Sequence, residues 1–328
     1  MGSDADIPPP NGTRVTGRPW GFWTEAKLQL LADYLDRFTT ATKHKATERI
    51  YLDLFAGEGH GISRTTGESF KASPRIALDV DDPAFTQLRF FELPPTAQRL
   101  ETSLRADYPD RPFRVVPGDC NDTVSGVLAE LKAQGLAWAP TFAFADPDGI
   151  KLRWTTLRSL SEHKRGSNNK IELWILLSSA GLMRVLRKNI TALTPDEEEQ
   201  ATQVYGSERW TSVQALRTGN DISPAQARDE FVNLYRWQLH YQLSYRWVHA
   251  LEIRTLHDRP LYHMVFATDN DAGNRIMAHL YNTAAARWPV MRQYAKARME
   301  GQQTLFGPAD VAVTEQMYRY EPPWEPPS

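Results

Sequence analysis

The sequence contains a single cysteine, Cys120, among 328 residues. A disulfide within the chain, an iron–sulfur cluster and a four-cysteine zinc site are therefore excluded, and we expect no metal site. The sequence also lacks a run of about 18 apolar residues, and its start lacks a basic region followed by an apolar stretch. We therefore expect neither a membrane span nor a signal peptide. The expected location is the cytoplasm.

An excess of basic residues is also missing, because 38 Lys and Arg stand against 40 Asp and Glu. This balance excludes a polycationic binder and leaves only a local patch for contact with nucleic acid. The stretch 151–188 holds nine basic residues against Glu162 and Glu172. These charges either border an acceptor pocket that attracts an anionic substrate such as RNA or DNA, or form an ordinary solvated surface.

Apolar periodicity is absent at both ends of the sequence. Residues 1–19 include Pro8, Pro9 and Pro10, and we expect a flexible arm there. Repeated prolines in 301–328 prevent a regular helix or strand, which predicts an extended tail. One domain is expected between them, over residues 20–300.

The domain shows the pattern of an α/β fold. Apolar residues at helical spacing predict a leading helix over 24–42, and compact apolar runs predict parallel strands at 50–55, 88–93, 113–116, 141–145 and 171–177. Runs at 246–253 and 261–268 flank a short polar turn and predict an antiparallel hairpin. Parallel strands followed by a C-terminal hairpin indicate the Rossmann-like sheet of class I methyltransferases rather than the dehydrogenase sheet.

A polar, helical insertion is expected at about 182–245. Pro195, followed by acidic residues, is typical of a helix start, since acids favour the positive end of a helix. A second helix over 224–245 gathers apolar residues on one face. That face comprises Phe231, Leu234, Tyr235, Gln238 and Leu239, with Trp237 and Tyr241 off it. Because the insertion lies near the ligand edge, it is a candidate lid or substrate cradle.

A glycine-rich turn follows the first predicted strand, in the run Asp53-Leu54-Phe55-Ala56-Gly57-Glu58-Gly59. Glycine lets the backbone approach a ligand closely and adopt positive φ. Open α/β sheets bind ligands at this carboxyl edge. The turn is therefore a candidate nucleoside-binding site.

Acidic residues stand at the next two strand ends. Glu92 can accept hydrogen bonds from ribose hydroxyls, and Asp119 can read an adenine amino group, although each could instead cap a helix. Glu92 lies 35 residues after Gly57, against about 20 in dehydrogenases, which disfavours NAD. These features predict S-adenosylmethionine as the cofactor. The predicted contacts are Asp53, Phe55, Gly57, Glu92, Asp119, Cys120 and Gly59.

The fourth strand ends in Asp146-Pro147-Asp148-Gly149, where we place the catalytic residues Asp146 and Pro147. The run is similar in part to the Asp/Asn-Pro-Pro-aromatic motif of amino-methyltransferases, whose side-chain oxygen orients the target amine. Asp148 and Gly149 replace the second proline and the aromatic, so the base-stacking platform is missing. The alternative is that Asp146 and Pro147 only end a strand and begin a turn.

Cys120 and two tryptophans, Trp154 and Trp174, are candidates for further roles. Asp53 to Gly57 also resembles the first motif of cytosine-C5 methyltransferases, but their nucleophilic cysteine follows the fourth strand. Cys120 follows the third, so we expect a small pocket residue. Trp154 and Trp174 could stack on a base, although Trp174 lies within a strand and fits the core better.

Several motifs together resemble the three-Cys-motif partner (TcmP) family over roughly residues 20–307. They are 23–38, 51–61, 118–121, 144–149, 181–182, 205–210, 262–273 and 303–306. The resemblance implies a methyltransferase-like fold and a partner, a radical S-adenosylmethionine-like protein with three cysteines. It implies no settled substrate. Family members more often carry an aromatic where Asp148 stands, so no acceptor role is carried over to that position.

The sequence supports two alternative hypotheses of function. The first is an S-adenosylmethionine-dependent methyltransferase that acts on nitrogen or oxygen, with nucleic acid as one candidate acceptor and Asp146 positioning it. The second is a non-catalytic cofactor-binding partner of the three-cysteine protein. An NAD-dependent oxidoreductase ranks third.

Overall fold

The computed structural model describes residues 22–63, 67–164, 169–178, 181–182, 193–255, 257, 259–299 and 320–327. The predicted arm at 1–19 lies outside the described residues. So do residues 301–319 of the predicted tail and residues 183–192 of the predicted insertion.

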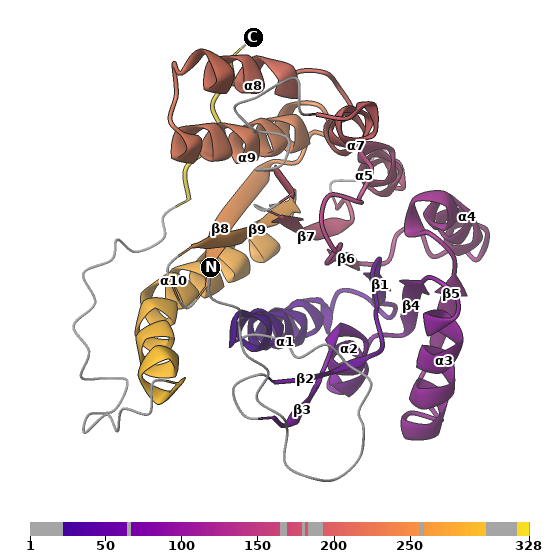
Figure 1. The fold of residues 1–328 in the computed structure, drawn as a ribbon. Helices are drawn as coiled ribbons and strands as arrows, with labels where there is room; N and C mark the ends of the chain where they lie inside the picture. Colours follow the sequence, from indigo (N-terminus) through magenta and orange to yellow (C-terminus); the bar gives the residue numbers. More distant parts are fainter. Residues whose placement is uncertain are drawn as a thin grey trace.

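A seven-stranded sheet forms the centre of the molecule (Figure 1). Its order is β5 (Phe113–Pro117), β4 (Gln87–Glu92), β1 (Ile50–Asp53), β6 (Thr141–Ala145), β7 (Glu172–Ser178), β9 (Pro260–Thr268) and β8 (Trp247–Arg254). The first five strands run parallel, whereas β9 pairs antiparallel with both β7 and β8. This is the Rossmann-like class I methyltransferase fold. The predicted fold class is confirmed, and every predicted strand lies within about two residues of an observed one.

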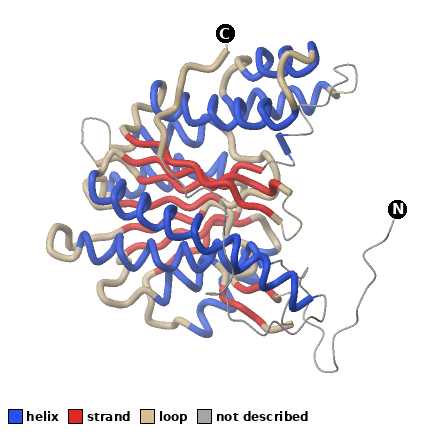
Figure 2. Tube along the Cα trace, turned by 90° about the vertical axis from the view of Figure 1, so that its left-hand side faces the viewer, coloured by secondary structure: helices blue, strands red, loops and turns tan. Residues whose placement is uncertain are grey.

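Helices cover both faces of the sheet (Figure 2). One apolar core contains side chains of α1 (Phe22–Thr42), α2 (Ser73–Asp79), α3 (Thr96–Asp107) and α10 (Asp271–Met299). The other contains side chains of α4 (Cys120–Ala133), α5 (Trp154–Glu162), α7 (Pro195–Tyr205), α8 (Trp210–Gly219) and α9 (Pro224–Tyr241). Parallel strands covered on both faces are mostly apolar, which is why they appear in the sequence as nearly continuous apolar runs.

Alternation along β6 shows how one strand serves both cores. Phe142 and Phe144 belong to the core beneath α1 and α10, whereas Ala143 and Ala145 belong to the core beneath α5. Successive side chains of a strand point to opposite faces, so this pattern follows directly from the sequence. The bulky face packs on the leading helix, where the Tyr34 and Phe142 ring centroids lie 5.2 Å apart. β6 is thereby fixed between both layers, and Asp146 follows it directly.

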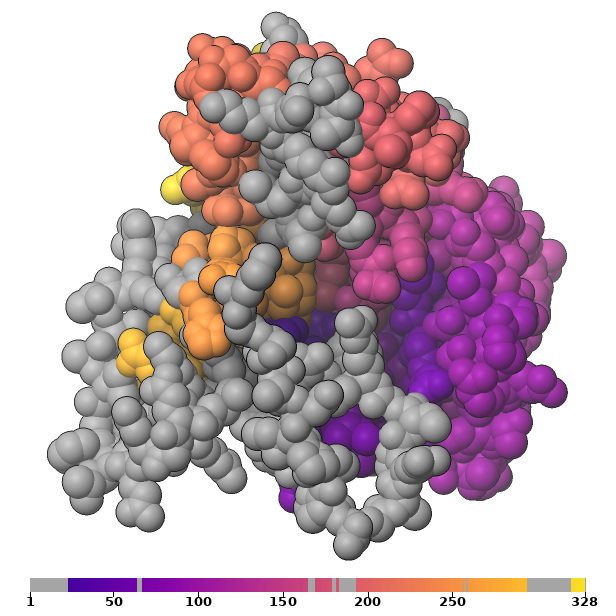
Figure 3. Space-filling model, viewed as in Figure 1, coloured from indigo at the N-terminus to yellow at the C-terminus, as the bar shows by residue number. Residues whose placement is uncertain are grey.

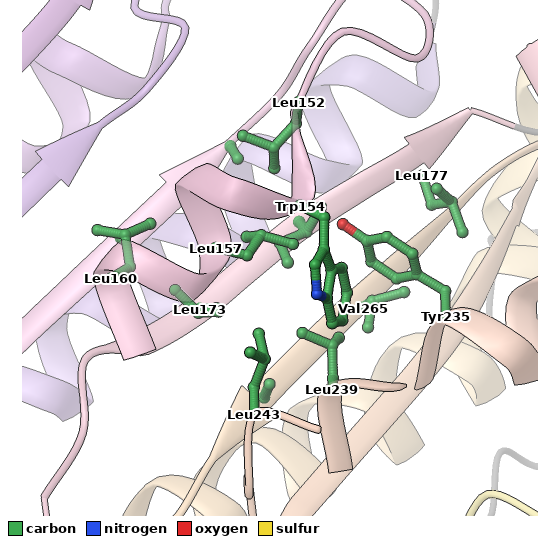
Figure 4. Packing of buried hydrophobic residues seen from close by; sticks show 14 of the residues in the cluster. Leu152, Trp154, Leu157, Leu160, Leu173, Leu177, Tyr235, Leu239, Leu243 and Val265 are labelled. Carbon is green, nitrogen blue, oxygen red and sulfur yellow. The ribbon is translucent and has the colours of Figure 1, made fainter. Parts of the chain in front are cut away.

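The insertion helix α9 packs as part of the core (Figure 4). Trp154 of α5 lies against Tyr235 with 5.7 Å between ring centroids, and Leu239 lies beside them. A Cβ on Gly206 would lie 2.2 Å from Trp154 Cδ1, so the end of α7 is closely packed there too. The predicted apolar face of α9 is confirmed, while Tyr241 is exposed. In Figure 3 the insertion helices form the upper part of the surface.

Both tryptophans considered for base stacking are buried. Trp154 is 1% exposed and Trp174 is 0% exposed. The expectation that Trp154 could stack on a base is therefore wrong, because α9 covers its ring. The core position expected for Trp174 is confirmed.

A short hairpin, β2 (His60–Ile62) with β3 (Ser69–Lys71), follows the glycine turn and was not predicted. It lies between β1 and α2 and lengthens the chain that separates Gly57 from Glu92. The long spacing that we held against NAD is therefore explained by an inserted hairpin, and it carries no information about the cofactor.

The described part of the tail, 320–327, has no helix or strand and contacts the α9 and β8 region. The Trp324 carbonyl accepts a hydrogen bond from Asn233 Nδ2 at 2.9 Å, and the Glu321 carbonyl accepts one from Arg236. The Tyr320 ring lies 4.2 Å from the His249 ring, centroid to centroid. In the described ranges, no helix is both long and apolar enough to cross a bilayer.

Candidate cofactor and acceptor site

A cavity of about 480 Å³ lies where β1, β4, β5 and β6 end. This volume is within the range of small-molecule sites, which is about 300–1,000 Å³. The wall includes the glycine turn, the first turns of α1 and part of α7. The predicted site residues that line it are Phe55, Gly57, Glu92, Asp119, Cys120 and Asp146. Residues far apart in the sequence thus meet at one edge of the sheet.

Glu92 braces the glycine turn. Its Oε2 accepts a hydrogen bond from the Gly57 amide at 2.7 Å, and its Oε1 accepts one from the Leu93 amide at 2.8 Å. Gly57 has φ of +65°, and a Cβ placed there would meet nothing within 4 Å. A carboxylate offers about four lone-pair positions, so Glu92 keeps acceptor capacity for a ligand. Glu92 therefore accepts hydrogen bonds from the glycine turn and from its own neighbour, and it does not cap a helix as the alternative expectation proposed.

Gly59 and Asp53 support the turn from behind. A Cβ on Gly59 would lie 2.9 Å from Leu100 Cδ1, so this glycine permits close packing on α3. The buried Asp53 carboxylate accepts from the Tyr51 hydroxyl at 3.2 Å and from the Phe55 amide at 3.4 Å. Burial raises the pKa of Asp53 to about 7. Neither Gly59 nor Asp53 lines the cavity, and their assignment as ligand contacts stays a prediction.

Asp119 is the N-cap of α4. Its Oδ1 accepts from both the Asn121 amide and Asn121 Nδ2, each at 2.8 Å, so the capping alternative is confirmed for this acid. Its Oδ2 lies 4.0 Å from Arg153. The neighbouring Cys120 is 3% exposed, and burial raises the pKa of its thiol. A nucleophilic cysteine needs the opposite shift, so Cys120 has the properties of a wall residue.

Asp146 is paired with a lysine that the sequence analysis missed. Lys27 of α1 forms a partly buried ion pair with Asp146 Oδ2, and the two side chains are 5% and 31% exposed. Both residues line the cavity, whereas Pro147 is buried just behind them. The signal was present in the sequence, because Lys27 precedes the buried Leu31 and Tyr34 by four and seven residues on α1. A lysine on the apolar face of a helix needs a buried partner.

Among the described residues that line the cavity, carboxylates outnumber cations. Its acidic lining residues are Glu58, Glu92, Asp119, Asp146 and Asp148, and its basic ones are Lys27, Lys151 and Arg153. Arg153 also bonds to Asp122 at 2.8 Å, and Lys151 lies 3.9 Å from Asp148. Opposite charges attract more strongly near low-dielectric walls, so the site favours a ligand with a positive centre.

The basic stretch 151–188 does not form one continuous surface in the described residues. Lys164 is buried and donates to the Ala139 carbonyl, and Lys170 donates to the Leu243 and Ser244 carbonyls at 2.6 and 2.8 Å. Four of its basic residues, Arg165, Arg184, Arg187 and Lys188, lie outside the described residues. Lys151 and Arg153 do border the cavity, as one of our two readings expected.

Among the described residues of the insertion, those that line the cavity belong to α7 and are Gln200, Gln203 and Val204. A second cavity, of about 740 Å³, lies between β8, α9 and α10. Some of its polar groups pair with one another, as in Arg254 Nε to Glu252 Oε2 at 2.6 Å. None of the catalytic or cofactor-binding residues predicted from the sequence lines this second cavity.

Comparisons with known proteins add little at the level of sequence. No family model matches the chain, and no curated protein matches it. Similar solved structures include the methyltransferase domain of bacterial CtHen1-CN, at 11% identity and a TM-score of 0.35, over 73% of this chain and 98% of that one. They also include the S-adenosylmethionine-dependent methyltransferase SibL, at 9% identity and a TM-score of 0.33, over 75% of this chain and 55% of that one. Structural similarity at these TM-scores is too weak to assign a fold or a function. The fold assignment therefore rests on the order and direction of the strands.

Proposed function

We propose that this chain is an S-adenosylmethionine-dependent methyltransferase. The observation that carries the proposal is the glycine turn braced by Glu92, which opens into an acidic cavity at the carboxyl edge of a class I methyltransferase sheet. Ligands of open α/β sheets bind at this edge.

The residues present fit this cofactor. Glu92 retains acceptor positions for two ribose hydroxyls, and Asp119 Oδ2, which lies 4.0 Å from Arg153, can accept from an adenine amino group. Open space beside Gly57 lets a ligand approach the backbone. When bound, the cofactor supplies an electrophilic methyl group on a positively charged sulfur. The chain contributes proximity and orientation, since methyl transfer depends mainly on in-line placement.

The test is calorimetry with S-adenosylhomocysteine. We expect a Kd in the micromolar range, about −8 kcal/mol, because the pocket is largely preformed. Gly57→Ala should weaken binding at least tenfold. Gly135→Ala is the matched control, since both glycines have positive φ, +65° and +74°, with nothing within 4 Å of the added Cβ. Binding of NAD in place of S-adenosylhomocysteine would overturn the proposal.

The acceptor is a nitrogen or an oxygen, and nucleic acid remains one candidate for the molecule that carries it. The Lys27–Asp146 pair also supports a second candidate function, because the carboxylate that would hold an amine is already engaged. In that case the chain is a non-catalytic cofactor-binding partner of a radical S-adenosylmethionine-like three-cysteine protein. Assays with labelled cofactor and total RNA, DNA and protein, with and without that partner, separate the two.

A further inference from the structure

Lys27 lines the cavity and has hydrogen-bond donors that its partner Asp146 does not use. An ammonium carries three N–H donors and accepts nothing. One donor is used by Asp146, and the side chain is 5% exposed. Its Nζ also lies 6.0 Å from the centroid of the Phe144 ring, and Phe144 precedes Asp146 by two residues. The group that meets an acceptor here is thus an ammonium held in place by a carboxylate.

An ammonium at this point discriminates between acceptor atoms. A neutral amine has one lone pair, so a hydrogen bond donated by Lys27 would occupy the pair that must attack the methyl carbon. A hydroxyl oxygen has two lone pairs and can accept from Lys27 with one while attacking with the other. The same donor also stabilises the negative charge that grows on oxygen as its proton leaves.

We propose that the acceptor atom is a hydroxyl oxygen and that Lys27 selects it. This inference rests on the proposed function. The oxygen forms a bond to the methyl carbon, the carbon–sulfur bond breaks, and its electron pair remains on sulfur. The hydroxyl proton passes to the Asp146 carboxylate and then to water. Asp146 thus receives the proton and orients Lys27, and it does not hold a target amine.

Transfer assays test the atom directly. Labelled cofactor is incubated with cellular RNA and with a small-molecule extract, and the products are digested and sorted by mass spectrometry into O-methyl and N-methyl species. We expect O-methyl products. Lys27→Met should slow their formation at least 100-fold, whereas Lys27→Arg, which keeps N–H donors, should retain more of the rate. N-methyl products would overturn the inference.

Cofactor binding separates this inference from the proposed function. S-adenosylhomocysteine affinity should stay within about threefold in Lys27→Met, since the cofactor contacts are elsewhere. Lys43→Met is the matched control, because Lys43 pairs with Asp82 at 2.7 Å near the other end of α1. It should leave transfer unchanged. If the wild type binds no S-adenosylhomocysteine, the proposed function itself fails.

A probe pair decides the matter even without turnover. Fluorine NMR on the protein saturated with S-adenosylhomocysteine compares 4-fluorophenol with 4-fluoroaniline, which differ only in the atom offered to Lys27. We expect the phenol to bind at least fivefold more tightly, and Lys27→Met to abolish that preference. Equal binding of the two probes, binding of neither, or a preference that survives in Lys27→Met contradicts the inference.

Discussion

Two polar clusters, one buried in the core and one partly exposed at the cavity, each include a residue of α1, and they differ in how much hydrogen-bonding capacity they leave unused. In the core cluster, Glu172 accepts from Tyr34 and from Thr268 Oγ1 at 2.9 Å. A Cβ on Gly273 would lie 2.2 Å from Glu172 Oε1, so no ligand has room there. In the cavity cluster, formed by Lys27, Glu92, Asp119 and Asp146, each group retains donors or acceptors toward open space. Spare hydrogen-bonding capacity beside a cavity distinguishes a site from a structural tie.

The largest expected effect is on the core cluster. Glu172→Ala should lower the free energy of unfolding by about 3 kcal/mol or more, because two buried hydroxyls lose their acceptor and a void remains. Urea denaturation measures this. S-adenosylhomocysteine affinity should not change. Glu172→Gln keeps an acceptor oxygen and should be less harmful, and a loss of affinity without a loss of stability would reverse the roles of the clusters.

Asp146→Asn should affect turnover instead. The amide oxygen can still hold Lys27, but it cannot receive a proton, so we expect transfer to slow about 100-fold, or about 2.7 kcal/mol in activation free energy. The unfolding free energy should fall by less than about 1 kcal/mol. Single-turnover rates and urea midpoints from one preparation measure both quantities. Full turnover in this variant would show that Asp146 takes no proton.

Glu92→Ala should weaken S-adenosylhomocysteine binding by about 1.5–3 kcal/mol, the range for hydrogen bonds to a charged group. Stability should change little, because the Gly57 and Leu93 amides can then bond to water. Calorimetry gives the affinity. Glu101→Ala is the control, since Glu101 lies on α3 and pairs only loosely with Arg105, at 3.8 Å. Unfolding with affinity intact would make Glu92 a structural brace alone.

The last expected effect is on the pH dependence of stability. Burial raises the pKa of Glu172 to about 7, above its ordinary value of 4.5. The folded state therefore holds a proton that the unfolded state releases at lower pH, and the unfolding free energy should fall as pH rises from about 4.5 to about 7, by at most about 3 kcal/mol. Urea midpoints at pH 5 and pH 8 measure the fall. Glu172→Gln, which stays neutral, should show a flatter profile.

The fold was predictable because its signals are local. Continuous apolar runs marked the strands, and the polar turn before Leu261 marked the hairpin. The β2–β3 hairpin escaped because its strands have three residues each, and one of them contains Gly61. Such short, partly exposed strands leave no periodic pattern.

Only those site residues that stand at the ends of strands could be predicted from the sequence. Glu92 is the last residue of β4 and Asp119 follows β5, so their convergence with Gly57 could be expected. Their partners could not, because the bond from the Gly57 amide to Glu92 and the Lys27–Asp146 pair depend on how separate elements pack. The basic stretch misled for the same reason, since its count could not show that Lys164 is buried.

The position of α1 has a consequence for the order of folding. The Lys27–Asp146 pair joins residues 119 apart, the Tyr34–Glu172 bond joins residues 138 apart, and the bond from Tyr262 to the Trp23 carbonyl, at 3.5 Å, spans 239. Contacts of such separation form only after long loops have closed, and domains rich in them fold slowly. During synthesis, α1 emerges first but must wait for β6, β7 and β9 before its polar groups find partners. The acceptor end of the site should therefore be among the last parts of the molecule to become ordered.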